Sequence, residues 1–171
     1  MLDPQQVPQG AKRSDYELFE ELYPKLRRFA AVVADSDIEP DDLLQDALLA
    51  TLRRHELAEL EHPEAYLRRS IINRASNRRR GLGRFRGLIG RLSTESETSD
   101  HYPSDISFLD ALSEVDRGIV YMADVEGIPL GVIARELDLT PAAVRKRISR
   151  ARGQLRKELS LTITAISEVS Q

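Results

Sequence analysis

Apolar residues recur at every third and fourth position along several stretches of this chain, and nowhere do they alternate as in a β-strand. Over residues 16–34 they include Leu22, Leu26, Phe29 and Val33. This spacing places them on one face of an α-helix, where they can form a core. The sequence therefore predicts an all-α protein.

The first half of the chain is expected to form one helical domain. After the helix over residues 16–34, the apolar pattern predicts a second over 40–54 and a third over 63–81. Each of the later two begins at a proline, which is favoured at the first helical position. These helices define a domain over residues 15–81, preceded by an N-terminal extension over 1–14.

Residues 82–107 break the helical period with glycines, serines, acids and a proline, which is typical of a flexible linker. In residues 108–160 a short helix, a tight turn and a new helix follow in helix-turn-helix spacing. Thr140 is expected to cap the new helix, with Pro141 at its first position. Residues 161–171 form a tail. The predicted fold is thus two small helical domains joined by a flexible linker, the C-terminal one a helix-turn-helix.

Positive charge is concentrated in two blocks, although the net charge is minus three. Residues 66–91 hold nine arginines and no acid, and residues 140–157 hold seven lysines or arginines and no acid. Two basic segments on an otherwise acidic chain indicate two contacts with a polyanion, and acidic surfaces for another partner. Solvated helix faces are the alternative for either block alone.

In the last helix, the apolar stripe determines which residues face outward. The stripe consists of Val144, Ile148, Ala151 and Leu155. The opposite face and the N-terminal turns are then free to enter a DNA major groove, with Arg145 and Lys146 the leading candidates for reading base edges. The predicted duplex-binding residues are Thr140, Ala142, Ala143, Arg145, Lys146, Ser149 and Arg150.

The helix over residues 63–81 also has an unusual outer face, which carries an aromatic ring, two amides and several arginines. Unpaired bases need a stacking platform, edge hydrogen bonds and phosphate neutralisation, which these side chains supply. Ordinary packing of Tyr66 and a local helix hydrogen bond of Asn73 are the alternatives. The predicted residues are Tyr66, Arg69, Asn73, Asn77, Arg78, Arg79 and Arg80.

The ordered set of motifs resembles the extracytoplasmic-function (ECF) sigma factors of the sigma-70 family. Residues 41–46 look like the acidic, Leu-rich helix that docks on the polymerase clamp. Residues 65–67, with Asn73 and residues 78–80, look like the segment that opens the minus-ten promoter element. Residues 109–155 match the domain that reads the minus-thirty-five element.

This resemblance implies a sigma factor that binds core RNA polymerase, recognises promoter DNA and promotes strand opening. Polymerase contacts, with the β and β′ subunits, are expected from one helix, and linker acids are expected in the polymerase cleft. An anti-sigma factor is a further expected partner. The helix residues are Asp41, Asp42, Leu43, Leu44, Gln45 and Asp46, and the linker acids are Glu95, Glu97 and Asp100.

The alternative function is a helix-turn-helix regulator that does not bind core polymerase. Its sensing domain would have no need of nine arginines near one helix. An enzyme is not expected, because Asp41, Asp42 and Asp46 have no accompanying histidine, phosphate-binding loop or nucleophile signature.

No cofactor or metal is expected, since the chain has no cysteine and its three histidines lack ligand spacing. No apolar run is long enough to cross a membrane, and residues 1–10 do not resemble a secretory signal. We therefore expect a cytoplasmic protein without membrane insertion.

Overall fold

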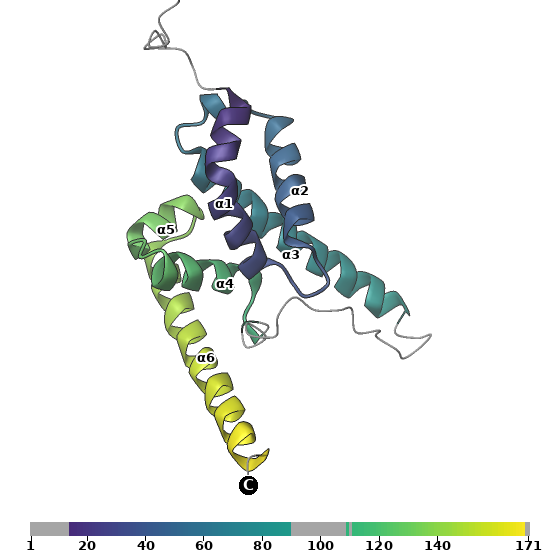
Figure 1. The fold of residues 1–171 in the computed structure, drawn as a ribbon, viewed down its shortest axis with the longest axis vertical. Helices are drawn as coiled ribbons and strands as arrows, with labels where there is room; N and C mark the ends of the chain where they lie inside the picture. The colour runs from purple at the N-terminus through teal and green to yellow at the C-terminus, as the bar shows by residue number, and fades with distance from the viewer. Residues whose placement is uncertain (1–13, 90–108, 110, 170–171) are drawn as a thin grey trace, which may run out of the picture.

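The computed structural model describes residues 14–89, 109 and 111–169, with side chains described through residue 80 and again for 109 and 111–160. No strand occurs in these ranges, so the prediction of an all-α fold is confirmed. The helices, coloured along the chain in Figure 1, are α1 (Asp15–Val33), α2 (Pro40–Leu52), η1 (Leu57–Glu59), α3 (Pro63–Ile89), α4 (Glu114–Val120), η3 (Tyr121–Val125), α5 (Leu130–Glu136) and α6 (Pro141–Val169).

The first helical unit is built on α1. A capping box starts this helix: the Ser14 hydroxyl accepts a hydrogen bond from the Glu17 backbone N–H, and the Glu17 carboxylate accepts one from the Ser14 backbone N–H. Leu26, Phe29 and Val33 are fully buried. Against them pack α2 and α3. Leu67, Ile71 and Ala75, which spacing predicts to face inward on α3, are buried, whereas Leu52, expected on the apolar side of α2, is 41% exposed.

Helix α3 does not end by Gly81, as expected from its glycines, but continues to Ile89. A glycine inside a helix costs only about 1 kcal/mol relative to alanine, which neighbouring helical residues can offset. The predicted end of this helix is therefore wrong. The rest of the predicted linker, residues 90–107, lies outside the described residues.

The first α-helix of the second unit is α4, where the Ser113 side chain caps the Asp116 backbone N–H. Leu109 and Leu112, before this helix, are already part of the core. Helix α4 runs directly into η3, a π-helical turn, and Gly127 then reverses the chain with a φ of 68°. Only glycine adopts this left-handed conformation without a steric cost. The helix-turn-helix follows as α5 and α6.

The turn between α5 and α6 is a Schellman motif. Asp138 adopts a φ of 56°, the Leu139 N–H donates to the Ala134 carbonyl, and the Asp138 N–H donates to the Arg135 carbonyl. Aspartate tolerates this conformation better than most residues. Thr140 then accepts a hydrogen bond from the Ala143 N–H, so its predicted capping role is confirmed. The backbone of α6 remains helical to Val169, through most of the predicted tail.

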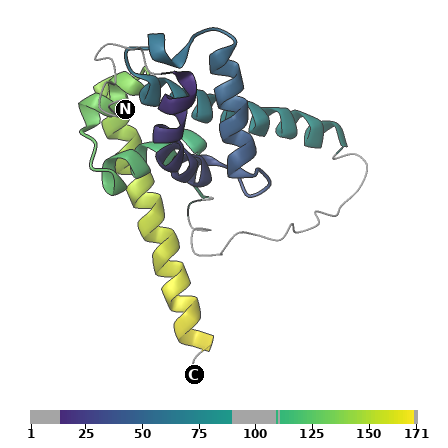
Figure 2. The same cartoon turned by 45° about the horizontal axis from the view of Figure 1, so that its top comes forward.

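The two units lie against each other. Helix α4 contacts α1 and α3, and α5 contacts α3. Figures 1 and 2 show α4 and α5 beside α1 from two directions, with α6 projecting away from the body. Buried residues of both units belong to one continuous apolar cluster.

Phe29 contributes to this cluster across the boundary between the two units. Its ring is fully buried and meets Tyr121 edge to face at 6.0 Å between ring centroids. We predict that Phe29→Ala lowers the free energy of unfolding by about 3–5 kcal/mol, the usual cost of a large buried cavity. Urea denaturation measures this, with the exposed Tyr16→Ala as the control, expected to cost less than about 0.5 kcal/mol. Equal effects of the two changes would contradict the packing described.

Candidate nucleic-acid and polymerase interface

Most of the residues predicted to bind duplex DNA lie on the outward face of α6. Val144, Ile148 and Ala151 are buried and Leu155 is half-buried, as expected. Ala142, Arg145, Lys146, Ser149 and Arg150 are exposed, Thr140 caps the helix from an exposed position, and Ala143 is half-buried. This is a solvent-facing surface at the start of a long helix, with three cationic side chains.

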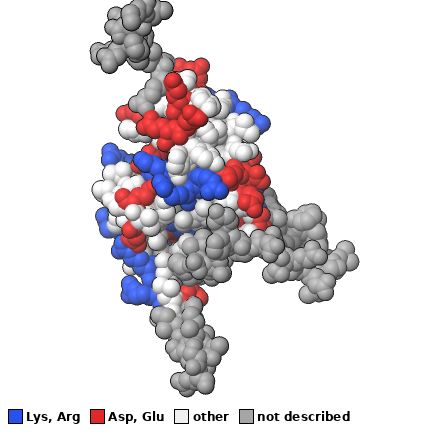
Figure 3. Space-filling model, in the orientation of Figure 1, with Lys and Arg blue, Asp and Glu red and all other residues white. Residues whose placement is uncertain are grey.

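Two other basic residues of α6 are held within the second unit. Arg147 pairs with Asp116 at 2.9 Å, and Arg152 pairs with Asp124 at 2.5 Å. Asp116 lies on α4 and Asp124 on η3, so these arginines fix α6 against both elements. Figure 3 shows basic atoms along one side of α6, whereas acidic atoms gather over the upper end of α1.

The outer face of α3 brings together five of the seven residues predicted there. They recur at steps of three and four, and Arg80 donates to the Asn77 side chain at 2.7 Å. The Tyr66 ring is half-buried, with the Arg69 guanidinium 5.5 Å from its centroid. These residues are Tyr66, Arg69, Asn73, Asn77 and Arg80, which we call the α3 face.

His55 belongs beside this face, although the sequence did not indicate it. Its ring meets Tyr66 edge to face, with 5.2 Å between centroids. It lies in the loop after α2, where no helical period relates it to α3. Only the fold places the two rings together.

Arg78 and Arg79 do not lie on the α3 face. Arg78 pairs with Asp46 on α2, and Arg79 pairs with Glu114 on α4 at 3.1 Å. The sequence predicts that this block of arginines has no compensating acids nearby, and the structure shows that this prediction is wrong. Acids on other helices, distant in the sequence, pair with these two arginines. A linear count of charges cannot detect such partners.

The predicted polymerase-binding helix α2 has an inner and an outer side. Leu43 and Leu44 are core residues, so they support the helix and do not offer a surface. Asp42 and Gln45 are exposed, and Asp41 and Asp46 are half-buried. Asp41 pairs with Arg27 at 3.0 Å and accepts a hydrogen bond from Tyr23.

Two further residues extend the outer side of α2. Leu49 is 54% exposed and Leu52 is 41% exposed. With Asp42 and Gln45 they recur at steps of three, four and three, which places all four on one face. We call them the α2 stripe. The same spacing in the sequence could have identified the two leucines as surface residues.

A buried arginine lies at the contact between the two units. Arg68 of α3 is 4% exposed and is surrounded by three carboxylates: Glu64 of its own helix, Glu126 at 2.7 Å and Glu136 at 3.3 Å. Its guanidinium also lies 5.7 Å from the centroid of the Phe29 ring. Neither Arg68 Nε nor Glu126 Oε2 has a hydrogen-bond partner. The ion pair between Arg68 and Glu126 is therefore close but poorly aligned.

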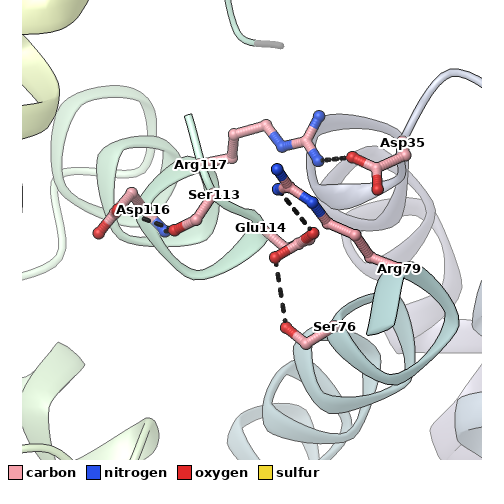
Figure 4. Close-up of polar contacts among 7 residues, drawn as sticks. All are labelled: Asp35, Ser76, Arg79, Ser113, Glu114, Asp116 and Arg117. Carbon is pink, nitrogen blue, oxygen red and sulfur yellow. Dashed lines mark hydrogen bonds and ion pairs between the residues drawn. The ribbon is translucent and has the colours of Figure 1, made fainter. Parts of the chain in front are cut away.

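A second buried arginine, Arg117 of α4, pairs with Asp35 at the end of α1. Figure 4 shows its guanidinium reaching out of α4 toward Asp35. The same figure shows Glu114 between Ser76 and Arg79 of α3. Ion pairs therefore cross from the start and from the middle of α4 to the first unit.

A groove of about 1310 Å³ opens between the units beside Arg68. Leu18, Leu22 and Leu60 line it from the first unit, and Val125 and Ile128 from the second. Within the described ranges, no cluster of acids and histidines is suited to hold a metal ion. The groove is mixed in character, with apolar side chains bordered by charged ones.

The excess of carboxylates around Arg68 predicts a pH dependence. Burial raises the pKa of Glu126, while Arg68 partly opposes the shift. Because the pKa of Glu126 is higher in the folded chain than in the unfolded chain, protonation of this carboxyl favours folding. The stability that protonation adds is lost as the pH rises through the folded pKa. We predict that Glu126→Gln stabilises the chain at pH 8 and has no effect at acidic pH, where Glu126 is already neutral. Urea denaturation at both pH values tests this; destabilisation throughout would contradict it.

Comparison with known proteins agrees with the sequence resemblance. The family model described as sigma-70 region 2 matches residues 18–85, and that of sigma-70 region 4 matches residues 106–155. Region 2 thus contains the α2 stripe and the α3 face, and region 4 contains the helix-turn-helix. The comparison with curated proteins gave no match.

One similar solved structure is the sigma factor RpoE in complex with the anti-sigma factor NepR from Bartonella quintana. It is 21% identical, with a TM-score of 0.64, and the match covers 85% of this chain and 96% of that one. The likeness shows the shared fold. None of the described helices is long and apolar enough to span a bilayer. With both conserved regions of the family present in order, the chain is a sigma factor of the sigma-70 family, of the extracytoplasmic-function type.

Proposed function

We propose that this sigma factor contacts DNA and polymerase through three separate surfaces. The α2 stripe binds the clamp of core RNA polymerase, the α3 face engages the opened minus-ten element, and the outward face of α6 reads the minus-thirty-five duplex. The single observation that carries this assignment is that each predicted set retains exposed residues on one face of its helix, while the helix's apolar side is buried.

For α6, the support is geometric. A recognition helix enters the major groove by its first turns, where Ala142, Arg145 and Lys146 are exposed. Arginine and lysine donate to guanine edges, and alanine leaves room for a thymine methyl group. Ser149 and Arg150, one turn further, are in position for phosphate or base contacts.

For α3, the support is chemical. Tyr66 offers an aromatic ring, Asn73 and Asn77 offer amide donors and acceptors, and Arg69 and Arg80 offer positive charge. Stacking and electrostatic attraction together hold single strands without needing a duplex. Because His55 and Arg69 pack against Tyr66, its ring is held in place for stacking.

For α2, two exposed leucines beside an aspartate and a glutamine form the kind of mixed surface that protein partners bind. We assign this surface to the β′ clamp, and propose further contacts with the β subunit. Glu95, Glu97 and Asp100, outside the described residues, are proposed to lie in the polymerase cleft.

The same proposal includes the cellular location of the chain, its lack of catalytic activity, a regulatory partner and its domain limits. The chain acts in the cytoplasm as a non-enzymatic initiation factor, without cofactor or metal. An anti-sigma factor is a proposed partner, as RpoE of Bartonella quintana is bound by NepR. The domain limits, 15–81 and 108–160, remain predictions, with the first extended by the length of α3 to residue 89.

The direct experiment is transcription by sigma-free core polymerase supplemented with the purified chain, on a pool of genomic promoter fragments. We expect discrete start sites that share two spaced upstream motifs. If no transcripts appear although the chain alone binds duplex DNA, the alternative of a conventional helix-turn-helix regulator would be favoured.

Separate surfaces predict separable defects. Lys146→Ala should weaken recognition of the minus-thirty-five element by about 1–3 kcal/mol and leave core binding intact. Asp42→Arg should do the reverse, because it reverses charge on the α2 stripe. Promoter binding by the holoenzyme and pull-down of core polymerase measure the two effects. Normal promoter binding by Lys146→Ala would show that the recognition helix is misplaced.

The ring of Tyr66 supplies a second test. Tyr66→Ala should reduce strand opening by about 1–3 kcal/mol, the usual contribution of stacking on one base. Tyr66→Phe keeps the ring and should retain opening. Permanganate reactivity of unpaired thymines in the minus-ten region reports the opening directly. A similar loss in both variants would assign the role to the hydroxyl instead.

A further inference from the structure

The recognition helix α6 is tied to the rest of region 4 at two points along its length. Arg147 Nη1 donates to Asp116 Oδ1 at 2.9 Å, and Asp116 lies on α4. Arg152 donates from Nε and Nη2 to the two carboxylate oxygens of Asp124, at 3.2 Å and 2.5 Å, and Asp124 lies on η3. The surfaces proposed above for DNA and polymerase include none of these four residues.

The two arginines lie on opposite flanks of the buried stripe of α6. Val144, Ile148 and Ala151 form this stripe and are at most 3% exposed. Because successive residues of an α-helix are rotated by about 100°, Arg147 lies roughly 70° to one side of the stripe and Arg152 roughly 70° to the other. The outward face of α6 lies beyond both flanks, on the far side of the helix. The helix is therefore held on both sides of its contact with the body of region 4.

Burial of the stripe does not by itself fix how far α6 is rotated about its own axis, because apolar burial is non-directional. Hydrogen-bonded ion pairs are directional, and the Arg152 guanidinium, which meets both oxygens of Asp124, is especially so. A pair on one flank resists rotation in one sense, and a pair on the other flank resists rotation in the opposite sense. Together the two pairs define one rotation.

We propose that Asp116 and Asp124 are positioning residues for reading of the minus-thirty-five duplex. Through Arg147 and Arg152 they set the rotation of α6 about its axis, and with it the side chains that meet the base edges. Neither carboxylate touches DNA, because each acts through its arginine. The proposal rests on the proposed function, since it concerns how the outward face of α6 is presented to the duplex.

Asp116 is held from two directions. It is 7% exposed, and the Ser113 hydroxyl donates to its second carboxylate oxygen at 2.7 Å, as Figure 4 shows. Arg147, whose side chain is 34% exposed, donates to the first oxygen. The carboxylate thus joins the capped start of α4 to the middle of α6. Because this pair is largely buried, salt screens it less than a pair at the surface.

Asp124 lies in the π-helical turn η3. In this turn the Glu126 N–H donates to the Tyr121 carbonyl, five residues earlier, at 3.1 Å. A π-turn takes in one residue more than an α-turn, so its residues are displaced around the helix axis from their α-helical positions. Such turns are frequent at functional sites. Here the turn presents Asp124 to Arg152 of α6.

Base discrimination by the holoenzyme tests the positioning. The probes are duplexes that the unmodified holoenzyme selects from a random pool, together with every single-base change in their shared upstream motif. Asp116→Asn and Asp124→Asn each keep the size of the side chain and remove its charge. We expect each variant to lose about threefold to tenfold of the discrimination against single-base changes, a part of what base-reading side chains supply. Core binding and the salt dependence of DNA binding should stay unchanged.

Asp138→Asn is the matched control. Asp138 is an exposed aspartate of the same helix-turn-helix, and asparagine tolerates its positive φ. The change removes the same charge and touches neither ion pair, so discrimination should be retained. Any general gain in DNA affinity from a lost negative charge is common to all three variants.

A charge swap separates positioning from a general loss of stability. Arg152→Asp alone should lose discrimination, because it brings two carboxylates together. The double variant Asp124→Arg, Arg152→Asp restores an ion pair on this flank and should recover most of the lost discrimination. Both side chains are partly exposed, so the swap buries no new charge. Thermal unfolding of each variant measures stability independently of DNA.

Distances between spin labels test the rotation without DNA. The chain has no native cysteine. Labels on Gly131→Cys of α5 and Ser149→Cys of α6, both at exposed positions, therefore report how α6 is turned. Asp116→Asn should shift the label distance in one direction and Asp124→Asn in the other. The control Asp138→Asn should leave the distance unchanged.

The proposal would be overturned by full discrimination in both asparagine variants, by an equal loss of affinity for all duplexes, or by label distances that neither variant changes. Tighter binding of every duplex by Asp124→Asn, with a steeper salt dependence, would also overturn it, because Arg152 would then be a phosphate contact. A holoenzyme that selects no shared upstream motif would instead count against the proposed function. In that case the label distances in the free chain still decide whether the two ion pairs set the rotation of α6.

Discussion

The arrangement of the two units depends on how two buried arginines are neutralised. Arg68 and Arg117 are 4% and 1% exposed, and a guanidinium taken out of water costs several kcal/mol unless acids reach it. Most of the acids come from the other unit: Glu126 and Glu136 for Arg68, and Asp35 for Arg117. Neither arginine can stay buried if the units separate.

This explains why local structure was predictable from the sequence and the contact between the units was not. Apolar stripes such as Val144, Ile148 and Ala151 are set by helical geometry alone, so burial followed from their spacing. Arg68 and Arg79 belong to a basic block that looks uncompensated along the chain, because their partners lie far away in sequence. The sequence also places the end of α3 too early, because the low helix propensity of glycine is a small effect that neighbouring residues can offset.

Some residues of the candidate sites could be predicted from spacing along the sequence, and others could be placed only by the fold. Spacing identified the α3 face and the outward face of α6, because each lies opposite a buried stripe. The polymerase-binding residues of α2 were expected from the family resemblance and not from spacing, and two of them, Leu43 and Leu44, are buried in the core. His55 could be placed beside Tyr66 only by the fold. The residues proposed to bind DNA face solvent on two helices, α3 and α6, and ion pairs join the two units that carry these helices.

The most direct test of the central claim, that α3 and α6 contact two distant parts of one promoter, is photocross-linking within the initiation complex. A photoreactive residue would replace either Asn77 or Ser149, and the cross-linked nucleotide would be mapped in each case. The account predicts unpaired DNA near minus ten for position 77, and duplex DNA near minus thirty-five for position 149. Cross-links from both positions to neighbouring nucleotides, or none from position 77, would contradict it.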